Sequence, residues 1–157
     1  MKEAELNTII RNSLIDRSRF GYKISDVGGG QQQRRPFDGL GVFDSRVVFW
    51  EAKIAKGVKA FNLCELFDGE RGHQMDTFES IKQETVGSQP RLWVVYGCSI
   101  PRNTRVYIFD YDLLRSLYKE QGVKSLHKKD LDTYLYNSIS KKRLASWNIN
   151  YIGQESI

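Results

Sequence analysis

Asp38, Glu51 and Lys53 are the residues of this 157-residue chain whose types and spacing point to chemistry. Twelve residues separate Asp38 from Glu51, and a single residue separates Glu51 from Lys53. Two converging carboxylates favour a hard divalent cation such as Mg²⁺, which takes oxygen ligands and keeps several of its waters. A lysine beside such a pair can orient or deprotonate one of those waters, or stabilise charge building on a phosphate. This set would suit phosphodiester hydrolysis if the three side chains meet.

A β-hairpin would bring these side chains together. Residues 39–43 and 46–50 read as two strands joined by a tight two-residue turn. Side chains alternate between the faces of a strand, so Glu51 and Lys53 are expected to point to the same side. Asp38, at the start of the first strand, then lies beside the end of the second. We therefore predict that the hairpin places Asp38 and Glu51 next to each other.

The same residues also fit an ordinary surface hairpin. In that interpretation Asp38 belongs to a turn, and Glu51 and Lys53 form an exposed cross-strand pair without chemistry. Short strings of this kind are common by chance, so the rest of the chain has to decide between the two interpretations.

Composition places the chain among ordinary globular proteins. It is 40% hydrophobic and 27% charged, and its length fits one domain, over residues 1–157, with a proper core. The net charge of +5, from 24 Lys and Arg against 19 Asp and Glu, favours a polyanionic partner. The chain has no apolar run long enough to span a membrane, and its first residues do not read as a signal peptide. The two cysteines have no metal-binding spacing and read as reduced thiols of a cytosolic protein.

Hydrophobic periodicity predicts an alternation of helices and strands. Residues 91–98 form a strongly apolar run, which indicates a central strand buried on both faces. Asp110 is the expected N-cap of the helix that follows the next strand. The expected helices cover residues 2–17, 72–83 and 111–119, and the expected strands cover residues 20–27, 39–43, 46–53, 91–98 and 105–109. This order predicts an α/β fold with a mixed central sheet flanked by helices.

Several basic segments are candidate DNA contacts. The loop before Asp38 carries Gln33, Arg34 and Arg35, whose side chains can contact phosphates or base edges. Lys56 and Lys59 follow the catalytic candidates, and Lys128 and Lys129 lie in a later basic stretch rich in aromatic residues. The alternatives are a disordered surface loop for the first segment and a solvated basic face for the others.

The combination of these segments resembles the RecU-type Holliday junction resolvases of the PD-(D/E)xK nuclease superfamily. The resemblance rests on Asp38 and Glu51-Ala52-Lys53, then Phe61-Asn62-Leu63 and His73-Gln74, then 93–95 with 106–109, 124–131 and 150–152. It covers nearly the whole chain, and these motifs together are far more specific than the first one alone. The resemblance implies a restriction-endonuclease-like core.

Residue by residue, the resemblance implies a metal site and a catalytic lysine. Asp38 and Glu51 would bind the metal, helped by the Ala52 carbonyl. Lys53 would position or activate the attacking water, and Gln74 would support the site. The products would be a 5′-phosphate and a 3′-hydroxyl.

The resemblance also implies Mg²⁺ as the cofactor, and we expect Mn²⁺ to substitute for it. Glu3, or less favourably Glu5, would reach a second metal or its waters. Both glutamates equally fit the first turn of a helix, where the helix dipole favours acidic residues.

The expected substrate is branched DNA. Resolving a four-way junction needs two symmetric cuts, which implies a homodimer; the first helix and the segment around residues 61–67 are its candidate surfaces. The chain departs from the family in two respects. The paired Pro-Asp of the superfamily is here Pro36-Phe37-Asp38, and residues 28–35 stand where the family has a long stalk that enters the junction. Such a compact version suits an enzyme encoded by a phage or mobile element and acting in the cytoplasm of a bacterial cell or phage-infected host.

Two other functions remain open from the sequence. The first is a restriction-like or repair endonuclease on duplex DNA, because the superfamily core is shared while recognition surfaces differ. The second is a DNA-binding protein without catalysis. The intact set of Asp38, Glu51 and Lys53 argues against the second, since a cluster of charges is costly to keep without a use.

Overall fold

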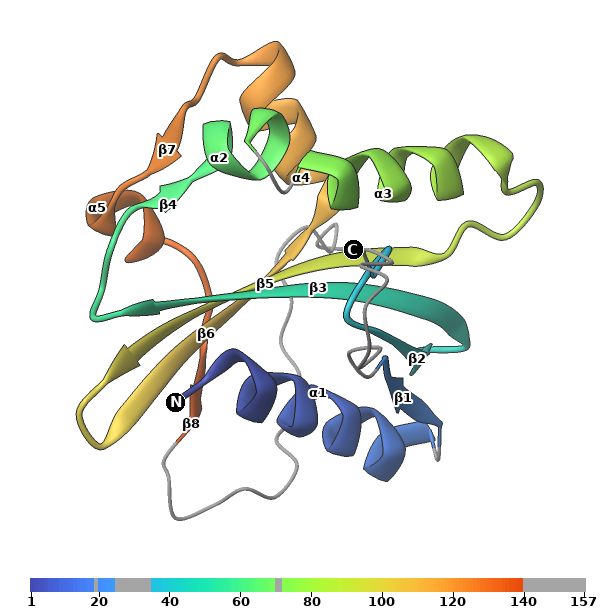
Figure 1. The fold of residues 1–157 in the computed structure, drawn as a ribbon, viewed down its shortest axis with the longest axis horizontal. Helices are drawn as coiled ribbons and strands as arrows, with labels where there is room; N and C mark the ends of the chain where they lie inside the picture. Colours follow the sequence, from blue (N-terminus) through green and yellow to red (C-terminus); the bar gives the residue numbers. More distant parts are fainter. Residues whose placement is uncertain (19, 25–34, 70–71, 140–157) are drawn as a thin grey trace, which may run out of the picture.

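The computed structural model describes residues 1–18, 20–24, 35–69 and 72–139 (Figure 1). They form a mixed α/β fold whose central sheet is mostly antiparallel and is flanked by helices. This confirms the expected mixed sheet between helices. The sheet has six strands in the order β1-β2-β3-β5-β6-β8, and β4 and β7 form a second, two-stranded sheet. Only the pairing of β3 with β5 is parallel within the six-stranded sheet.

Along the described chain, α1 comes first, and the strands and the remaining helices follow it. The helices are α1 (Glu3–Ser18), α2 (Leu63–Asp68), α3 (Gly72–Glu84), α4 (Tyr111–Arg115), the π-helical turn η1 (Ser116–Glu120) and α5 (Lys128–Leu131). The strands are β1 (Gly21–Lys23), β2 (Gly39–Phe43), β3 (Arg46–Lys56), β4 (Phe61–Asn62), β5 (Arg91–Ile100), β6 (Asn103–Asp110), β7 (Ser125–Leu126) and β8 (Asn137–Ile139).

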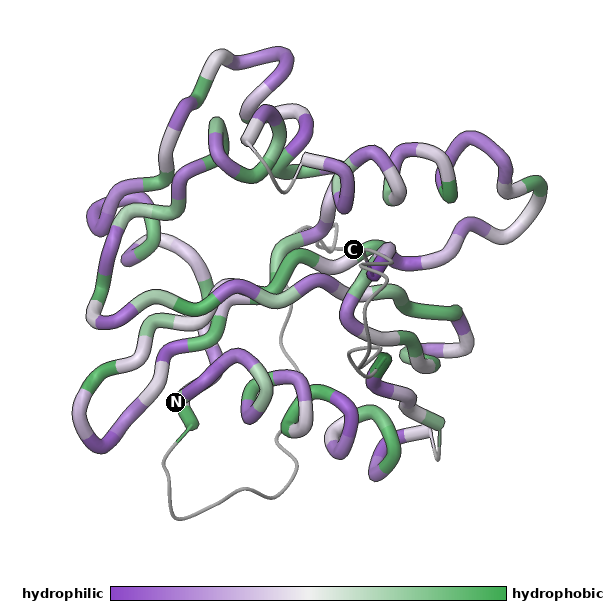
Figure 2. The backbone as a smooth tube through the Cα atoms, viewed as in Figure 1, coloured by the Kyte–Doolittle hydropathy of each residue, from purple (hydrophilic) through white to green (hydrophobic). Residues whose placement is uncertain are grey.

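Two hydrophobic layers lie on opposite faces of the central sheet. Among the helices of the described residues, α1 lies on one face, while α2, α3 and α4 lie on the other side (Figure 1). Hydrophilic and hydrophobic positions alternate along α1, as expected for a helix with one face on a sheet (Figure 2). Its buried apolar side chains are Leu6, Ile9, Ile10 and Leu14, which pack with Trp50, Trp93 and Val95. Neighbouring positions along the same strands, such as Val94 and Tyr96, point into the other layer.

The predicted hairpin of β2 and β3 is confirmed. Leu40 pairs with Phe49 and Phe43 with Arg46, so the turn consists of Asp44 and Ser45. Both turn residues have positive φ, 47° and 63°, as a two-residue turn of this kind requires. The prediction of a buried central strand is confirmed too, because β5 lies between β3 and β6 and is buried along most of its length.

Several elements differ from the sequence prediction. Strand β3 continues to Lys56 and so passes the catalytic candidates. The expected helix over residues 111–119 becomes α4 followed by η1. The short elements α2, β4, β7, α5 and β8 are additional to the expected order. Residues 25–27 of the expected first strand lie outside the described residues.

Most apolar side chains of the two segments expected at a dimer interface are buried within the chain, and Leu6, Ile9, Leu14 and Leu63 have no exposed surface. Ile15 of α1 is 37% exposed and Phe67 is half-buried. The homodimer and its interface stay predictions. Among the described residues, no helix combines the length and the apolar composition needed to cross a bilayer.

Candidate active site

The backbone places Asp38 directly beside the end of the hairpin. Its N–H donates to the Trp50 carbonyl at 2.9 Å, which extends the pairing of β2 with β3 by one residue. The Trp50 ring lies against Gly39, where a Cβ atom would come within 2.2 Å of it. Any side chain at position 39 would therefore clash with the ring, and this glycine lets the strand start immediately after Asp38.

Asp38 and Glu51 are both buried, with 1% of each residue exposed. Asp38 Oδ2 accepts a hydrogen bond from the Ala52 N–H at 2.9 Å. The other oxygen, Oδ1, and Glu51 Oε2 are buried and have no hydrogen-bond partner among the residues that the structure describes. The interpretation of these residues as an exposed surface hairpin is therefore wrong. Both carboxylates are buried, and each has one oxygen that accepts no hydrogen bond from the described residues.

The environment of Glu51 disfavours its charge. The pKa of the Glu51 carboxyl is raised to about 7, mainly by burial and next by the nearby Asp38 carboxylate. The Lys53 ammonium acts in the opposite direction, and Glu3 adds to the repulsion. A divalent cation bound between Asp38 and Glu51 would offset both the burial of Glu51 and the repulsion between the two carboxylates.

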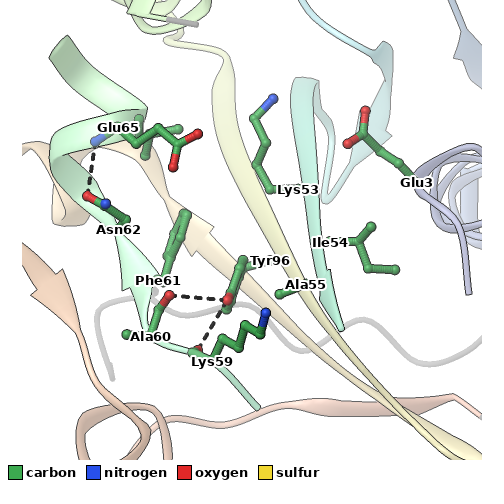
Figure 3. A pocket seen from close by; sticks show the side chains of 11 residues that line it. Glu3, Lys53, Ile54, Ala55, Lys59, Ala60, Phe61, Asn62, Glu65 and Tyr96 are labelled. Atoms are coloured by element: carbon green, nitrogen blue, oxygen red, sulfur yellow. Dashed lines mark hydrogen bonds between the residues drawn. The ribbon is translucent and has the colours of Figure 1, made fainter. Parts of the chain in front are cut away.

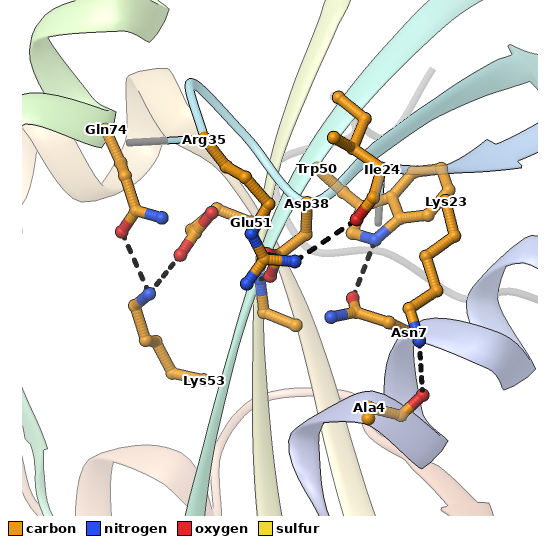
Figure 4. Close-up of polar contacts among 11 residues, drawn as sticks. Ala4, Asn7, Lys23, Ile24, Arg35, Asp38, Trp50, Glu51, Lys53 and Gln74 are labelled. Carbon is orange, nitrogen blue, oxygen red and sulfur yellow. Dashed lines mark hydrogen bonds and ion pairs between the residues drawn. The ribbon is translucent and has the colours of Figure 1, made fainter. Parts of the chain in front are cut away.

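Lys53 connects the carboxylate pair to helix α3 (Figure 4). Its Nζ donates to Glu51 Oε1 and also to Gln74 Oε1, the latter at 3.0 Å. Gln74 lies in the first turn of α3 and is 9% exposed. The structure thus brings together the four residues predicted to be catalytic, with the Lys53 amine fixed between a carboxylate and an amide oxygen.

Glu3 lies near these four residues, whereas the Glu5 carboxylate makes a contact at the start of α1. Glu3 is in the first turn of α1, lines a cavity together with Lys53, and is close enough to Glu51 to influence its pKa. A buried hydrogen bond of 2.9 Å from Trp50 Nε1 to Asn7 Oδ1 fixes α1 against β3. The Glu5 carboxylate instead accepts from the Lys2 N–H, which is a helix-start contact.

Arg35 lies closer to the carboxylates than the sequence indicated. Its Nη1 donates to the Ile24 carbonyl at 3.2 Å and is 3.5 Å from Asp38 Oδ1 (Figure 4). The guanidinium is therefore placed beside a predicted metal ligand as well as near any phosphate bound there. Its two predicted companions, Gln33 and Arg34, lie outside the described residues.

The predicted lysine contacts are spread over two regions. Lys56 ends β3 and is exposed, and Lys59 lines the same cavity as Lys53. Lys128 and Lys129 lie on α5, and Lys128 Nζ pairs with Asp132 at 2.6 Å. Of these four, Lys59 is the one whose side chain shares a cavity with the catalytic candidates.

Sequence reasoning missed the residues that close this cavity. Asn62 is the N-cap of α2 and its Oδ1 accepts from the Glu65 N–H at 3.0 Å. Tyr96 forms part of the opposite wall. An Asn followed three residues later by Glu is a helix-start signal, and it would have located α2. The predicted role of the Ala52 carbonyl stays a prediction, since the observed contact of Ala52 is through its N–H.

The donor set fits a cation that keeps part of its water shell. Within the described ranges, no three Asp, Glu, His or Cys side chains gather into a metal centre of their own. Mg²⁺ is commonly bound through one or two carboxylates together with waters and substrate phosphates. Asp38 Oδ1 and Glu51 Oε2 would supply the two protein oxygens of such a site.

Comparison with known proteins assigns the chain to no family. No model of a known protein family matches the chain, and no curated protein is similar enough to be counted as a relative. The functional conclusion therefore rests on the residues and their geometry.

Proposed function

We propose that this chain is a Mg²⁺-dependent endodeoxyribonuclease of the PD-(D/E)xK type, with a restriction-endonuclease-like core. The observation that carries the proposal is the buried pair Asp38 and Glu51, each with one oxygen that accepts no hydrogen bond from the described residues, next to Lys53, whose amine is hydrogen-bonded to Glu51 and Gln74. The antiparallel β2–β3 hairpin, the parallel β3–β5 pair and helices on both faces of the sheet are consistent with the expected core.

Each residue then has a defined part. Asp38 and Glu51 hold the cation, and Gln74 keeps the Lys53 amine directed at the space beside Glu51. Lys53 orients the attacking water and balances charge on the phosphate. A bound Mg²⁺ supplies a more acidic water and polarises a phosphate oxygen. A carboxyl with a pKa of about 7 in the metal-free protein becomes a fully charged ligand once a divalent cation compensates its burial.

We propose four-way DNA junctions as the preferred substrate, cut symmetrically by a homodimer. The proposal is supported by the resemblance of the sequence to RecU-type resolvases over nearly the whole chain. The rival substrate is ordinary duplex DNA, and a specific observation favours it: only residues 28–35 stand in the place of the junction-entering stalk.

A cleavage assay tests both parts of the proposal. Labelled four-way junction and matched linear duplex are incubated with Mg²⁺ or with EDTA, using the parent, Lys53→Ala and the control Lys119→Ala. Lys119 is half-exposed, pairs with Asp68 at 3.7 Å and is not among the residues of the candidate site. Paired nicks in the junction, lost with EDTA and in Lys53→Ala alone, are the expected result. Equal cutting of duplex removes the junction preference, and an absence of cutting with intact DNA binding contradicts the nuclease proposal.

A further inference from the structure

A cavity of about 280 Å³ lies between Lys53, Glu3 and the start of α2 (Figure 3). Lys53 is common to the cavity and the candidate active site. The walls come from Glu3 of α1, Ala55 of β3, Tyr96 of β5, Phe61 of β4, and Asn62 with Glu65 at the start of α2. A ligand in this cavity would therefore lie next to the phosphate that the carboxylates and Lys53 act on.

The wall opposite α1 includes two aromatic side chains, Phe61 and Tyr96. The rings of Phe61 and Tyr96 are stacked, with centroids 4.3 Å apart and planes 10° from parallel. The Tyr96 hydroxyl donates towards the Lys59 and Ala60 carbonyls, at 3.1 and 3.4 Å (Figure 3). These contacts fix the segment before β4 against β5, so the cavity is formed without a ligand, as small-molecule sites usually are.

The rim offers one hydrogen-bond donor and one acceptor. Because Asn62 Oδ1 is used by the Glu65 N–H, its amide nitrogen remains available to donate. The Glu65 carboxylate is exposed and has no hydrogen-bond partner among residues 1–18, 20–24, 35–69 and 72–139. A flat apolar wall beneath a neighbouring donor and acceptor is complementary to the face and edge of a nucleobase.

We propose that this cavity binds the base of the nucleotide next to the scissile phosphate, turned out of the DNA stack. The inference rests on the proposed nuclease function, because the position of the phosphate is taken from it. The volume is just below the roughly 300–1,000 Å³ typical of small-molecule pockets, which suits one nucleotide and excludes a longer segment. Lys53 and Lys59 provide positive charge for the attached phosphates.

A base-binding cavity would give a preference for branched over linear DNA without a stalk. Turning a base out of the stack costs least where the nucleotide is already unpaired or poorly paired. The centre of a branched DNA offers such nucleotides, whereas a regular duplex does not. The cavity would therefore favour branched over linear DNA through the cost of exposing one base.

Nucleotide binding tests the cavity without any cleavage. The affinity of each deoxynucleoside 5′-monophosphate is measured by calorimetry and compared with that of 2-deoxyribose 5-phosphate, which lacks the base. The variants are Glu65→Gln, which removes the acceptor charge, and Ala55→Leu, which fills the cavity. Glu84→Gln, at the exposed far end of α3, is the matched control, and thermal melts check that each variant is folded.

We expect the parent to bind at least one nucleotide about tenfold more tightly than the sugar phosphate. Glu65→Gln should weaken nucleotide binding roughly threefold to tenfold, because a neutral amide oxygen is a weaker hydrogen-bond acceptor than a carboxylate. Ala55→Leu should abolish the difference between nucleotide and sugar phosphate, and Glu84→Gln should behave as the parent. Equal affinity of the parent for nucleotides and sugar phosphate overturns the proposal. If Ala55→Leu does not fold, an unchanged affinity in Glu65→Gln overturns it.

Cleavage of DNA separates this inference from the proposed function. An abasic residue placed beside the mapped cleavage position should slow the parent several-fold and leave the Ala55→Leu rate unchanged. If the abasic residue does not change the cleavage rate, the base-binding role is overturned and the proposed nuclease function is unaffected. Base-dependent nucleotide binding without cutting of any DNA overturns the nuclease and leaves a nucleotide site.

Discussion

The carboxylate of Asp38 is tied to the backbone of Ala52, whose N–H donates to Oδ2 over 2.9 Å. Ala52 directly follows Glu51, so this bond fixes the approach of one carboxylate to the other across the hairpin. Asparagine at position 38 can still accept this hydrogen bond through its amide oxygen. Asp38→Asn therefore removes the charge while it keeps the geometry, and it is the better probe of metal binding than Asp38→Ala.

Replacing Lys53 by methionine should abolish cleavage and spare DNA binding. The amine lies between Glu51 and Gln74, and methionine keeps the length of the chain without the charge. Proton transfer or charge balance by one positioned group contributes about 10²–10⁴-fold, so single-turnover cleavage should fall by that amount. Lys119→Met should cut at the parent rate. A Lys53→Met enzyme that cuts within a few-fold of the parent contradicts the catalytic role.

Replacing Gln74 by alanine should lower the cleavage rate roughly tenfold with little change in KM. The variant loses a 3.0 Å hydrogen bond to a charged amine, and such bonds are worth more than neutral ones. Gln83→Ala, near the other end of the same helix, controls for changes in α3. Steady-state kinetics with saturating DNA separate the two parameters. A rise in KM alone would instead indicate that Gln74 contacts DNA.

Arg35 should oppose metal binding and support DNA binding. Its guanidinium is 3.5 Å from Asp38 Oδ1, where it repels an incoming cation. We expect Arg35→Gln to bind Mn²⁺ several-fold more tightly in the absence of DNA. If Arg35 also contacts a phosphate, the slope of log affinity for DNA against log salt should fall by about one. Unchanged affinities for metal and DNA would show that the role of Arg35 is limited to its hydrogen bond with the Ile24 carbonyl.

Much of this arrangement could be predicted from the sequence, because it depends on local patterns. The hairpin turn at Asp44 and Ser45, the alternation that places Glu51 and Lys53 on one face, and the Asp110 N-cap are confirmed. Each follows from residue type and spacing within one or two elements. The burial of Glu51 does not, since it depends on packing that sequence spacing cannot supply.

The elements that were missed are short or depend on distant partners. Strand β4 has two residues and exists through pairing of Phe61 with Leu126, which lie far apart in the sequence. The cavity with Glu65 likewise joins segments separated along the chain. No periodicity marks a contact of this kind, so the cavity appears only in three dimensions.

The stability of the metal-free protein should depend on the ionisation of Glu51. The pKa of this carboxyl is about 7 in the folded chain against 4.5 without the fold. Between these values the folded state binds more protons than the unfolded state. The free energy of unfolding should therefore fall, by an amount on the order of 3 kcal/mol, as pH rises from about 4.5 to about 7.

Denaturant unfolding in EDTA, compared between the parent and Glu51→Gln across this range, isolates the contribution of Glu51. The neutral glutamine should remove that part of the pH dependence, and the difference between the two proteins should grow with pH. Glu84→Gln should follow the parent. Parallel curves for the parent and Glu51→Gln would contradict the raised pKa of Glu51.

Direct binding of Mn²⁺, followed by electron paramagnetic resonance at pH 8 with and without DNA, tests the central claim that Asp38 and Glu51 form a divalent-cation site. We expect saturable binding to the parent, displacement by Mg²⁺, and a loss of affinity of roughly a hundredfold or more in both Asp38→Asn and Glu51→Gln. Glu84→Gln should bind as the parent does. A parent that binds no Mn²⁺ even with DNA, or variants that bind it equally well, would show that Asp38 and Glu51 are not metal ligands.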